Sequence, residues 1–197
     1  MLTLSQVAHN PHRYTRTISA GSDGPLLIRP LMTDDGDLLA MFLGGLSPET
    51  RRFSTFSSYD RAMALELCDA IVRYDKLRFV IETPSGEIAG MLEFSFAITE
   101  NDQARYTRYG FSLDPETDCR FGPTLADEYQ NRGIGTLALP FMKDVAGEFG
   151  RSRIILWGGV LADNVRAIRY YQKNGFQRVG GFQNSDGVEA VDMMLAL

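Results

Sequence analysis

The chain has 197 residues, of which 44% are hydrophobic, so it can fill the core of a domain of ordinary size and is not a disordered protein. Its formal net charge of −5 argues against a general nucleic-acid binder, which would normally carry a basic patch. The two cysteines, Cys68 and Cys119, lack the spacing of metal ligands and are too few for a disulfide framework, so we expect no metal and a reducing compartment.

The N-terminal stretch of residues 1–24 predicts a polar arm that is partly disordered, and residues 25–197 predict a single domain. The arm has no apolar core of signal-peptide length, and no run in the chain approaches the ~20 apolar residues of a membrane span. We therefore expect a cytoplasmic protein that binds neither membranes nor nucleic acid.

The first half of the domain predicts one strand followed by helices. Residues 25–31 form a short apolar strand, and the helix that follows has Thr33 as its cap and one apolar face. Ser47 caps a further helical turn that has proline at its first position. Residues 60–74 form the next helix, which is capped by Asp60.

Strands dominate the middle of the domain. Residues 76–82 and 87–98 predict two strands joined by a turn of sequence TPSG. The segment 99–118 is harder to interpret, and residues 104–113 could form an extra strand. Residues 119–129 predict a strand that leads into the glycine-containing stretch QNRGIG.

The last third alternates helices and strands. A helix is predicted over 133–149, with Pro140 inside it as the expected place of a kink or a lost hydrogen bond. An apolar strand follows at 152–160, and a helix then begins after Asn164 and stops at Gly175. A hairpin around the sequence NSDG ends the chain, so the order of elements predicts a mixed α/β domain.

The glycine-containing stretch has the chemistry of an anion site. The first N–H groups of a helix lack partners within the helix, and the helix dipole places partial positive charge there. Gly133 and Gly135 remove the Cβ atoms that would keep a phosphate away, and Arg132 could add a charged hydrogen bond. A plain tight turn is the alternative, and the patterns of a Walker loop or a dinucleotide-binding fingerprint are not met.

Gln130–Gly135 resembles the Gln/Arg-x-x-Gly-x-Gly/Ala motif of the GNAT acetyltransferase superfamily. A second stretch, NVRAIRYYQKNGF, is also similar to this family, through Asn164, Ala167, Ile168, Tyr171, Lys173, Gly175 and Phe176. The resemblance implies a GNAT α/β fold with flanking helices and a mixed central sheet that is splayed between the fourth and fifth strands, here 119–129 and 152–160. It also implies acetyl-CoA as the co-substrate.

The resemblance further implies roles for single residues. The pantetheine arm would pair with the backbone of Leu125 and Ala126. A backbone N–H of the strand 119–129 would donate a hydrogen bond to the thioester carbonyl and polarise it. Tyr171 would protonate the leaving thiolate after direct attack by an amine. The remaining cofactor contacts would come from Gln130, from the backbone of Arg132, Gly133, Ile134, Gly135 and Thr136, and from Asn164, Ala167 and Lys173. Two of these residues also have purely structural interpretations: Asn164 could be a simple helix cap, and Tyr171 could be an aromatic residue of the core.

The general base is not evident. The stretch LSPETRRF and the elements after it look like the GNAT domains of protein acetyltransferases fused to acyl-CoA-synthetase-like modules. Those domains often carry a glutamate ten positions before the motif glutamine, where this chain has Arg120, and arginine cannot act as a base. Glu93 is the catalytic candidate that we name, and Asp118 or a water molecule is the alternative.

Two functions of different kinds remain. The first is an acetyl-CoA-dependent N-acetyltransferase acting on a small-molecule or protein amine. The second is a non-catalytic GNAT module that senses acyl-CoA or an amino acid, which the presence of Tyr171 disfavours. A nucleotide-binding protein of another fold is a third, weaker reading. The acceptor amine is not encoded in any motif, and a homodimer is left open.

Overall fold

The computed structural model describes residues 1–21, 24–73 and 75–197. The chain divides into two compact units. The N-unit comprises Leu2–Phe94 and Pro123–Met142, and the C-unit comprises Met1, Ser95–Gly122 and Lys143–Leu197. Strand β5 (Asp118–Leu125) and helix α7 (Ile134–Glu148) contribute residues to both units.

The sheet of the N-unit has the strand order β1-β2-β3-β4-β5. Its strands are the end of β5 together with β1 (Arg16–Ser19), β2 (Pro25–Pro30), β3 (Lys76–Glu82) and most of β4 (Ile88–Ser95). β2 pairs antiparallel with both β1 and β3. Beyond the end of β5, the amide of Ala126 donates to the carbonyl of Ala89 at 2.9 Å. The predicted strands at 25–31, 76–82 and 87–98 are therefore present.

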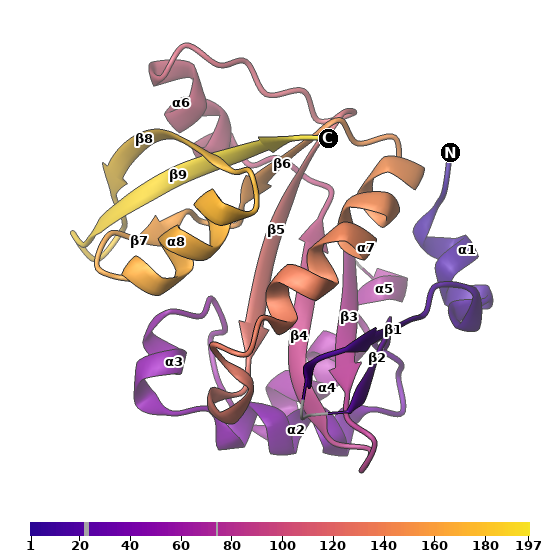
Figure 1. Ribbon diagram of the computed structural model, residues 1–197. Coiled ribbons are helices and arrows are strands. Elements are labelled where there is room, and N and C mark those ends of the chain that lie inside the picture. The colour runs from indigo at the N-terminus through magenta and orange to yellow at the C-terminus, as the bar shows by residue number, and fades with distance from the viewer. Residues whose placement is uncertain (22–23, 74) are drawn as a thin grey trace. The chain divides into compact units, whose positions relative to one another are not determined.

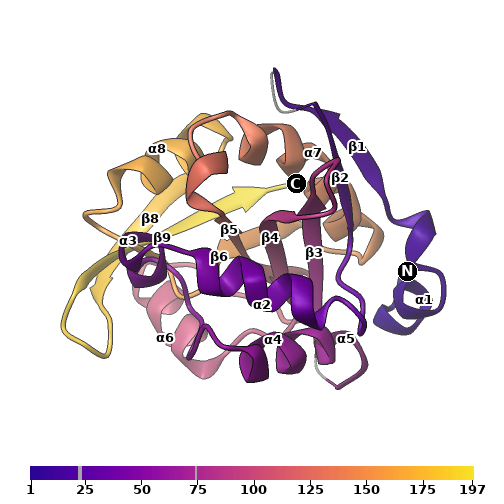
Figure 2. The same ribbon diagram turned by 90° about the horizontal axis from the view of Figure 1, so that it is seen from below.

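The core of the N-unit lies between this sheet and two helices, α2 (Gly36–Gly45) and α4 (Arg61–Cys68). Figure 2 shows α2 in front of β3 and β4, with α4 beside it. Leu39 and Leu43 of α2 and Leu67 of α4 pack with Val80 and Met91 of the strands. Complete burial of such a side chain contributes about 1.5–3 kcal/mol, so this cluster holds the helices to the sheet.

Two helix boundaries of the N-unit differ from the sequence prediction. Helix α2 begins after Asp35 and not after Thr33, because the Asp35 carboxylate accepts hydrogen bonds from Arg29 at 2.7 and 2.8 Å and from the amide of Met32 at 2.7 Å. The helix predicted at 60–74 is divided at Asp69 into α4 and α5 (Ala70–Arg73). Asp60 caps α4 as predicted, and residue 74 lies outside the described residues.

The N-terminal segment is more ordered than the arm that the sequence suggested. It contains α1 (Leu4–His9), the 3-10 turn η1 (Pro11–Arg13) and β1, which pairs along its whole length with β2. Val7 and Ile18 are buried, which explains why this polar stretch packs against the N-unit. Residues 22 and 23 of the predicted arm lie outside the described part of the chain.

The sheet of the C-unit has the order β5-β6-β9-β7, and β8 pairs with β9 (Figure 1). Its further strands are β6 (Arg153–Leu156), β7 (Val160–Leu161), β8 (Gln177–Gln183) and β9 (Glu189–Ala196). β5 and β6 are parallel, whereas β9 is antiparallel to its neighbours, so the sheet is mixed as predicted. The β5–β6 register ends at Phe121 opposite Leu156, so this ladder covers only the first half of β5.

The helices of the C-unit include one correction. Residues 104–113 do not form a strand, because α6 (Glu100–Arg108) takes up the first half of this segment and residues 109–113 form a turn and a loop. Thr99 and Asp102 form a capping box in which each side chain accepts a hydrogen bond from the other residue's amide. Helix α8 (Val165–Lys173) begins after Asn164, and Gly175 follows it with a φ of 92°, as the sequence predicted.

Candidate active site

The loop between β5 and α7, residues 126–135, has an unusual backbone. We call it the glycine loop. It contains the 3-10 turn η3 (Asp127–Tyr129) and two residues in the left-handed region, Asn131 with a φ of 62° and Gly133 with a φ of 79°. A Cβ atom at Gly133 would have no heavy atom within 4 Å, so glycine is required there by conformation, and open space lies before the backbone.

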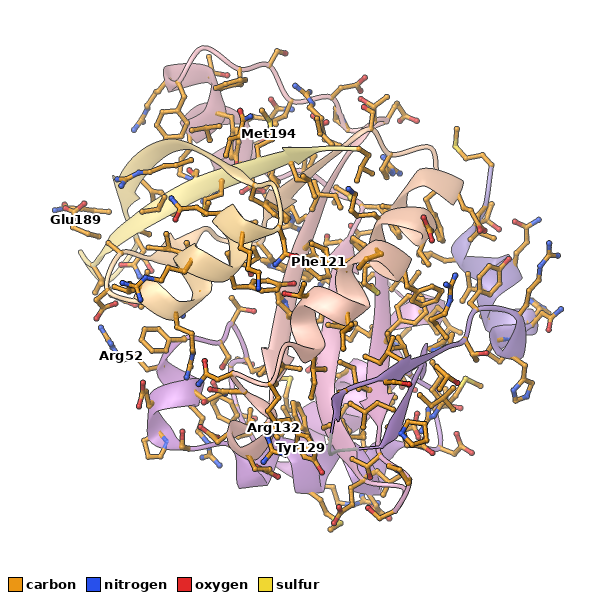
Figure 3. All side chains as sticks on the ribbon, in the orientation of Figure 1. Arg52, Phe121, Tyr129, Arg132, Glu189 and Met194 are labelled. Atoms are coloured by element: carbon orange, nitrogen blue, oxygen red, sulfur yellow. The ribbon has the colours of Figure 1, made fainter. Side chains whose placement is uncertain are left out.

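The glycine loop ends at the N-terminus of α7, where the geometry suits an anion. The first helical bond shown at this end runs from the amide of Leu137 to the carbonyl of Gly133 at 3.0 Å. The amides before Leu137 lie at the positive end of a helix of 15 residues. Arg132 is exposed, and its guanidinium lies 5.6 Å from the ring centre of Tyr129 (Figure 3). The residues predicted to hold a pyrophosphate thus form one loop with the required chemistry.

The end of β5 offers one backbone amide to a ligand. The N–H of Ala126 is bonded to Ala89, and neighbouring residues of a strand direct their polar groups to opposite edges. Leu125 therefore directs its amide away from β4. Its carbonyl accepts a hydrogen bond from Nε2 of Gln130 at 2.9 Å. Of the two residues expected to pair with a pantetheine arm, Leu125 has the suitable amide.

Three residues in or beside the glycine loop were not identified from the sequence. Asp127 accepts hydrogen bonds from Ser47 and Thr50, which lie at the start of helix α3 (Pro48–Arg52). Burial acts to raise the pKa of the Asp127 carboxyl, but the hydrogen bonds from Ser47 and Thr50 hold that pKa below its ordinary value. No local pattern links positions 47 and 127, and only the cap function of Ser47 was visible in the sequence.

Helix α8 carries the other predicted contacts. The side-chain oxygen of Asn164 accepts a hydrogen bond from the amide of Ala167 at 3.1 Å, so Asn164 acts as the helix cap. Lys173 is exposed in the last turn. Tyr171 is only 7% exposed, and its ring packs edge-on against Phe176 at 5.1 Å between ring centres.

The protonation state of Tyr171 suits an acid. Burial raises the pKa of its hydroxyl, and the neighbouring Tyr170 adds to this effect. The hydroxyl is therefore neutral at physiological pH and retains a proton to donate. The same packing would serve a core aromatic, so the role of Tyr171 remains a prediction.

The two candidate bases are held in ion pairs. Glu93 on β4 is 5% exposed, and it accepts a hydrogen bond from Nε of Arg78 at 2.7 Å. Burial raises the pKa of the Glu93 carboxyl, and Arg78 opposes this effect. Asp118 is fully buried and bonded to Arg153 at 2.6 Å. Both carboxylates thus have a structural partner.

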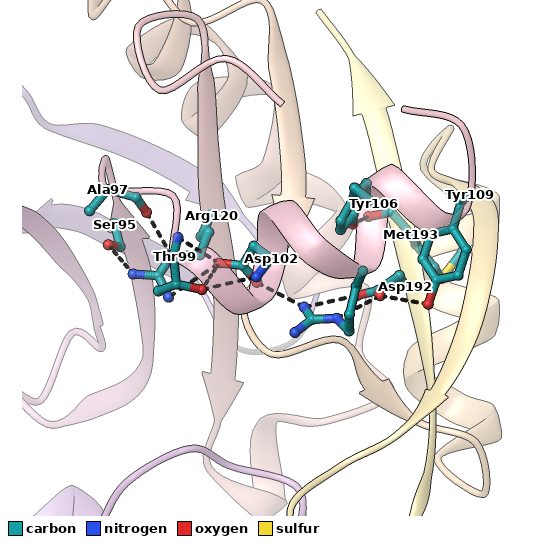
Figure 4. A network of polar contacts seen from close by, with 10 residues as sticks. Ser95, Ala97, Thr99, Asp102, Tyr106, Tyr109, Arg120, Asp192 and Met193 are labelled. Carbon is teal, nitrogen blue, oxygen red and sulfur yellow. Dashed lines mark hydrogen bonds and ion pairs between the residues drawn. The ribbon is translucent and has the colours of Figure 1, made fainter. Parts of the chain in front are cut away.

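Arg120, which occupies the position where the resemblance led us to look for a glutamate, belongs to a polar network of the C-unit (Figure 4). Its guanidinium donates to the carbonyl of Ala97 at 2.8 Å and to the hydroxyl of Ser95 at 2.7 Å. It also lies 3.7 Å from a carboxylate oxygen of Asp102 and 4.8 Å from the ring centre of Trp157. These contacts fix a permanent positive charge at this position of β5.

The predicted site residues thus form two sets, each within one unit. Leu125, Ala126, Gln130 and the backbone from Arg132 to Thr136 meet where β5 leads into α7 in the N-unit, and Glu93 lies elsewhere in that unit. Asn164, Ala167, Tyr171 and Lys173 lie on or beside α8 in the C-unit. Within the described residues, no cluster of histidine, cysteine or acidic side chains could hold a metal ion. None of the helices described there is long and apolar enough to cross a membrane.

Comparisons with known proteins identify the family and the fold. The family model of the Acetyltransferase (GNAT) family matches residues 46–176, which include both sets. A search of curated proteins found no match.

Among solved structures, the GNAT domain of S. lividans PAT has a TM-score of 0.71 at 21% identity, over 95% of this chain and 99% of that one. The structure of AAC(6')-Ib with paromomycin and acetyl-CoA has a TM-score of 0.67 at 19% identity, over 87% and 93% of the two chains. RimL, a ribosomal alpha-N-protein acetyltransferase, has a TM-score of 0.68 at 14% identity, over 93% and 95%. These likenesses concern the fold, which is the α/β GNAT fold with a mixed, open central sheet. Since the family model covers more than half of the sequence, the chain belongs to the GNAT family of acetyltransferases.

Proposed function

We propose that this protein is an acetyl-CoA-dependent N-acetyltransferase that transfers acetyl directly to an amine of a small molecule or a protein. The observation that carries the proposal is the glycine loop, in which left-handed Asn131 and Gly133 lead into the N-terminus of α7 with open space at the Gly133 Cβ position. A relative of the same fold was solved with acetyl-CoA. The pyrophosphate of acetyl-CoA has the charge and size that this loop suits.

The residues would divide the reaction between binding and proton transfer. The amide of Leu125 binds the pantetheine arm, and the glycine loop and Arg132 bind the phosphates. The acceptor nitrogen attacks the thioester carbon, so a C–N bond forms while the C–S bond breaks. Tyr171 donates its proton to the leaving sulfur, and its neutral, buried hydroxyl supports this role.

We assign the acceptor only as an amine and name no particular compound. The similar structures belong to enzymes whose printed names point to different acceptors, an aminoglycoside in one case and a ribosomal protein in another. The proposal assigns the proton of the attacking amine to water and not to Glu93, because that carboxylate is buried against Arg78. A cytoplasmic location remains part of the proposal, supported by two free, buried cysteines.

The proposal is tested by ligand binding followed by an amine screen. Acetyl-CoA at a hundredfold excess over its Kd should stabilise the fold by about 2.7 kcal/mol, measured as a rise in Tm. Release of free thiol on addition of polyamines, aminoglycosides or peptide amines would then identify the acceptor class. If millimolar acetyl-CoA leaves the Tm unchanged while NAD or ATP raises it, the proposal is wrong. Binding without thiol release from any amine would favour the sensing module.

A further inference from the structure

Helix α3 and the glycine loop are joined by a group of polar side chains that we call the hydroxyl cluster: Ser47, Thr50, Asp127 and Gln130. The Ser47 hydroxyl and the Thr50 hydroxyl each lie 2.6 Å from Oδ1 of Asp127, and the Ser47 amide lies 2.9 Å from Oδ2. Nε2 of Gln130 lies 3.0 Å from the Thr50 hydroxyl oxygen. All four residues belong to the N-unit.

The direction of the hydrogen bonds that link Gln130, Thr50 and Asp127 follows from one carbonyl. The oxygen of Leu125 can only accept, so the side-chain nitrogen of Gln130 must face it. The second proton of that nitrogen is then donated to the Thr50 hydroxyl oxygen. The Thr50 hydroxyl proton is consequently left for Asp127, and the chain of donors runs from Gln130 through Thr50 to the carboxylate.

The carboxylate is the fixed end of this chain. Asp127 accepts three hydrogen bonds, and its lowered pKa keeps it ionised at physiological pH, when it can only accept. Thr50 is 6% exposed, so its own hydroxyl has little access to water as an alternative partner. Hydrogen bonds to an ionised acceptor are about twice as strong as neutral ones, which favours a single arrangement of the cluster.

Helix α3 is itself anchored on its other side. Arg51 donates to the carbonyl of Leu46 at 2.8 Å and to that of Gly44 at 2.7 Å, at the end of α2. The Arg51 guanidinium also lies 4.6 Å from the ring centre of Tyr59, whose hydroxyl donates to the Arg51 carbonyl at 2.8 Å. The hydroxyl cluster therefore connects the glycine loop to a helix that is held in place by its other contacts and does not move with the loop.

We propose that Thr50 and Asp127 are positioning residues for acetyl-CoA, which hold Gln130 and hence the glycine loop in its binding-competent shape. The inference rests on the proposed function and adds the stretch SPET to it. Gln130 directly precedes Asn131, whose left-handed backbone begins the path to α7. If the loop adopts this shape in only a fraction of the molecules, the apparent Kd for acetyl-CoA equals the intrinsic Kd divided by that fraction.

Paired substitutions of Thr50 separate positioning from packing. Thr50→Val keeps the volume and removes the hydroxyl, so we expect the Kd for acetyl-CoA to rise about tenfold with a smaller change in Tm. Thr50→Ser keeps the hydroxyl and removes a buried methyl group, so we expect a lower Tm and a Kd within about twofold of the wild type. Glu49→Ala, at the exposed neighbour of Thr50 on α3, should leave the Kd unchanged and the Tm nearly so.

The Kd is measured by titration calorimetry with acetyl-CoA, and the Tm is measured without ligand. If Thr50→Ser loses affinity while Thr50→Val retains it, the threonine acts by packing and the inference is overturned. Equal affinity of both variants and the wild type would overturn it as well. Failure of the wild-type protein to bind acetyl-CoA would instead count against the proposed function. Asp127→Ala should reproduce the loss seen with Thr50→Val.

Discussion

Each unit contains a polar cluster that ties a helix to a distant part of the chain, and the two clusters are built differently. In the N-unit, the hydroxyl cluster gathers around one carboxylate, that of the exposed Asp127. In the C-unit, a charged cluster of Asp102, Arg105, Arg120 and Asp192 joins α6 to β5 and β9. Asp192 is fully buried, and Arg105 lies 2.8 Å from it.

The difference separates stability from binding. A buried charge that loses its counter-ion destabilises the fold strongly, because desolvation is no longer offset. An exposed carboxylate that loses a hydroxyl donor can bond to water instead, so the folded state changes little in free energy while the loop beside it loses its fixed shape. We therefore expect substitutions in the charged cluster to act on unfolding and those near the glycine loop to act on acetyl-CoA.

The largest effect is expected from Asp192→Ala. This change leaves the partly buried Arg105 with only one of its two carboxylate partners, Asp102, which also lies 2.8 Å away, so the free energy of unfolding should fall by about 3 kcal/mol. Urea denaturation at neutral pH measures it. Glu189→Ala, at an exposed position of the same strand, is the control and should lose less than about 0.5 kcal/mol. A loss below about 1 kcal/mol for Asp192→Ala would show that the buried charges do not determine the stability of the C-unit.

Tyr171→Phe tests whether the C-unit also supplies chemistry. We expect turnover to fall about 10²-fold, equivalent to about 2.7 kcal/mol, with nearly unchanged acetyl-CoA affinity, since the ring remains and only the proton donor is lost. Thiol release at saturating acetyl-CoA, with an amine found in the screen, is the measurement. Tyr170→Phe is the control. If Tyr170→Phe is the slow variant, the acid is the other tyrosine, and if neither is slow, water supplies the proton.

Gly133→Ala tests the backbone of the glycine loop. A residue with a Cβ atom at a φ of 79° loses about 1–2 kcal/mol of stability, and the new methyl group enters the open space before the loop. We expect a lower free energy of unfolding and a weaker binding of acetyl-CoA. Gly147→Ala within α7 is the matched control, since nothing lies within 4 Å of its Cβ position, and it should stabilise the protein by about 0.5–1 kcal/mol. Effects of the same sign would contradict the strain argument.

The smallest effect distinguishes the two clusters by pH. Burial raises the pKa of Asp192 although Arg105 opposes it, so the part of its stability contribution that depends on protonation is present below pH 3.8 and is lost as pH rises through the folded-state pKa, while its contacts with Arg105 remain. The pKa of Asp127 is lowered by its hydrogen bonds, which outweigh burial, so its contribution is present above 3.8 and is lost as pH falls. The effect at the exposed Asp127 should be the smaller of the two, because solvent screens its charge.

Unfolding of the wild type, Asp192→Asn and Asp127→Asn between about pH 3 and pH 6 measures these contributions. The difference in free energy between wild type and Asp192→Asn should decrease as pH rises. The difference for Asp127→Asn should decrease as pH falls. Two slopes of the same sign would show that the carboxylates do not have opposite environments.

The local parts of the fold were predictable from the sequence. β3 was placed correctly because an apolar run ends at a turn of sequence TPSG, and α8 because Asn164 and Gly175 mark its two ends. The family was predicted correctly from a short motif around Gly133 and Gly135. The left-handed backbone at Gly133 explains why this motif contains a glycine there.

The missed features depend on contacts between distant residues. The capping box of α6, formed by Thr99 and Asp102, was not recognised in the sequence, and residues 104–113 were considered as an extra strand. The helix is stabilised by Tyr106, which is fully buried and bonded to the carbonyl of Met193 at 3.1 Å. The hydroxyl cluster joins positions 80 residues apart, as Ser47 and Asp127 are, and no local pattern predicts such a pair.

The surroundings of Arg120 restrict how this lineage can change. Its guanidinium is held by a carbonyl, a hydroxyl, the Asp102 carboxylate and the face of Trp157, all of which suit a cation. A single mutation to glutamate would place two carboxylates together and remove the cation from the indole ring. Relatives that carry glutamate at this position should therefore differ at position 102 as well, and a return to glutamate would need at least two coordinated changes. Arg120 and its neighbours therefore act as one unit, which a substitution at position 120 alone cannot convert.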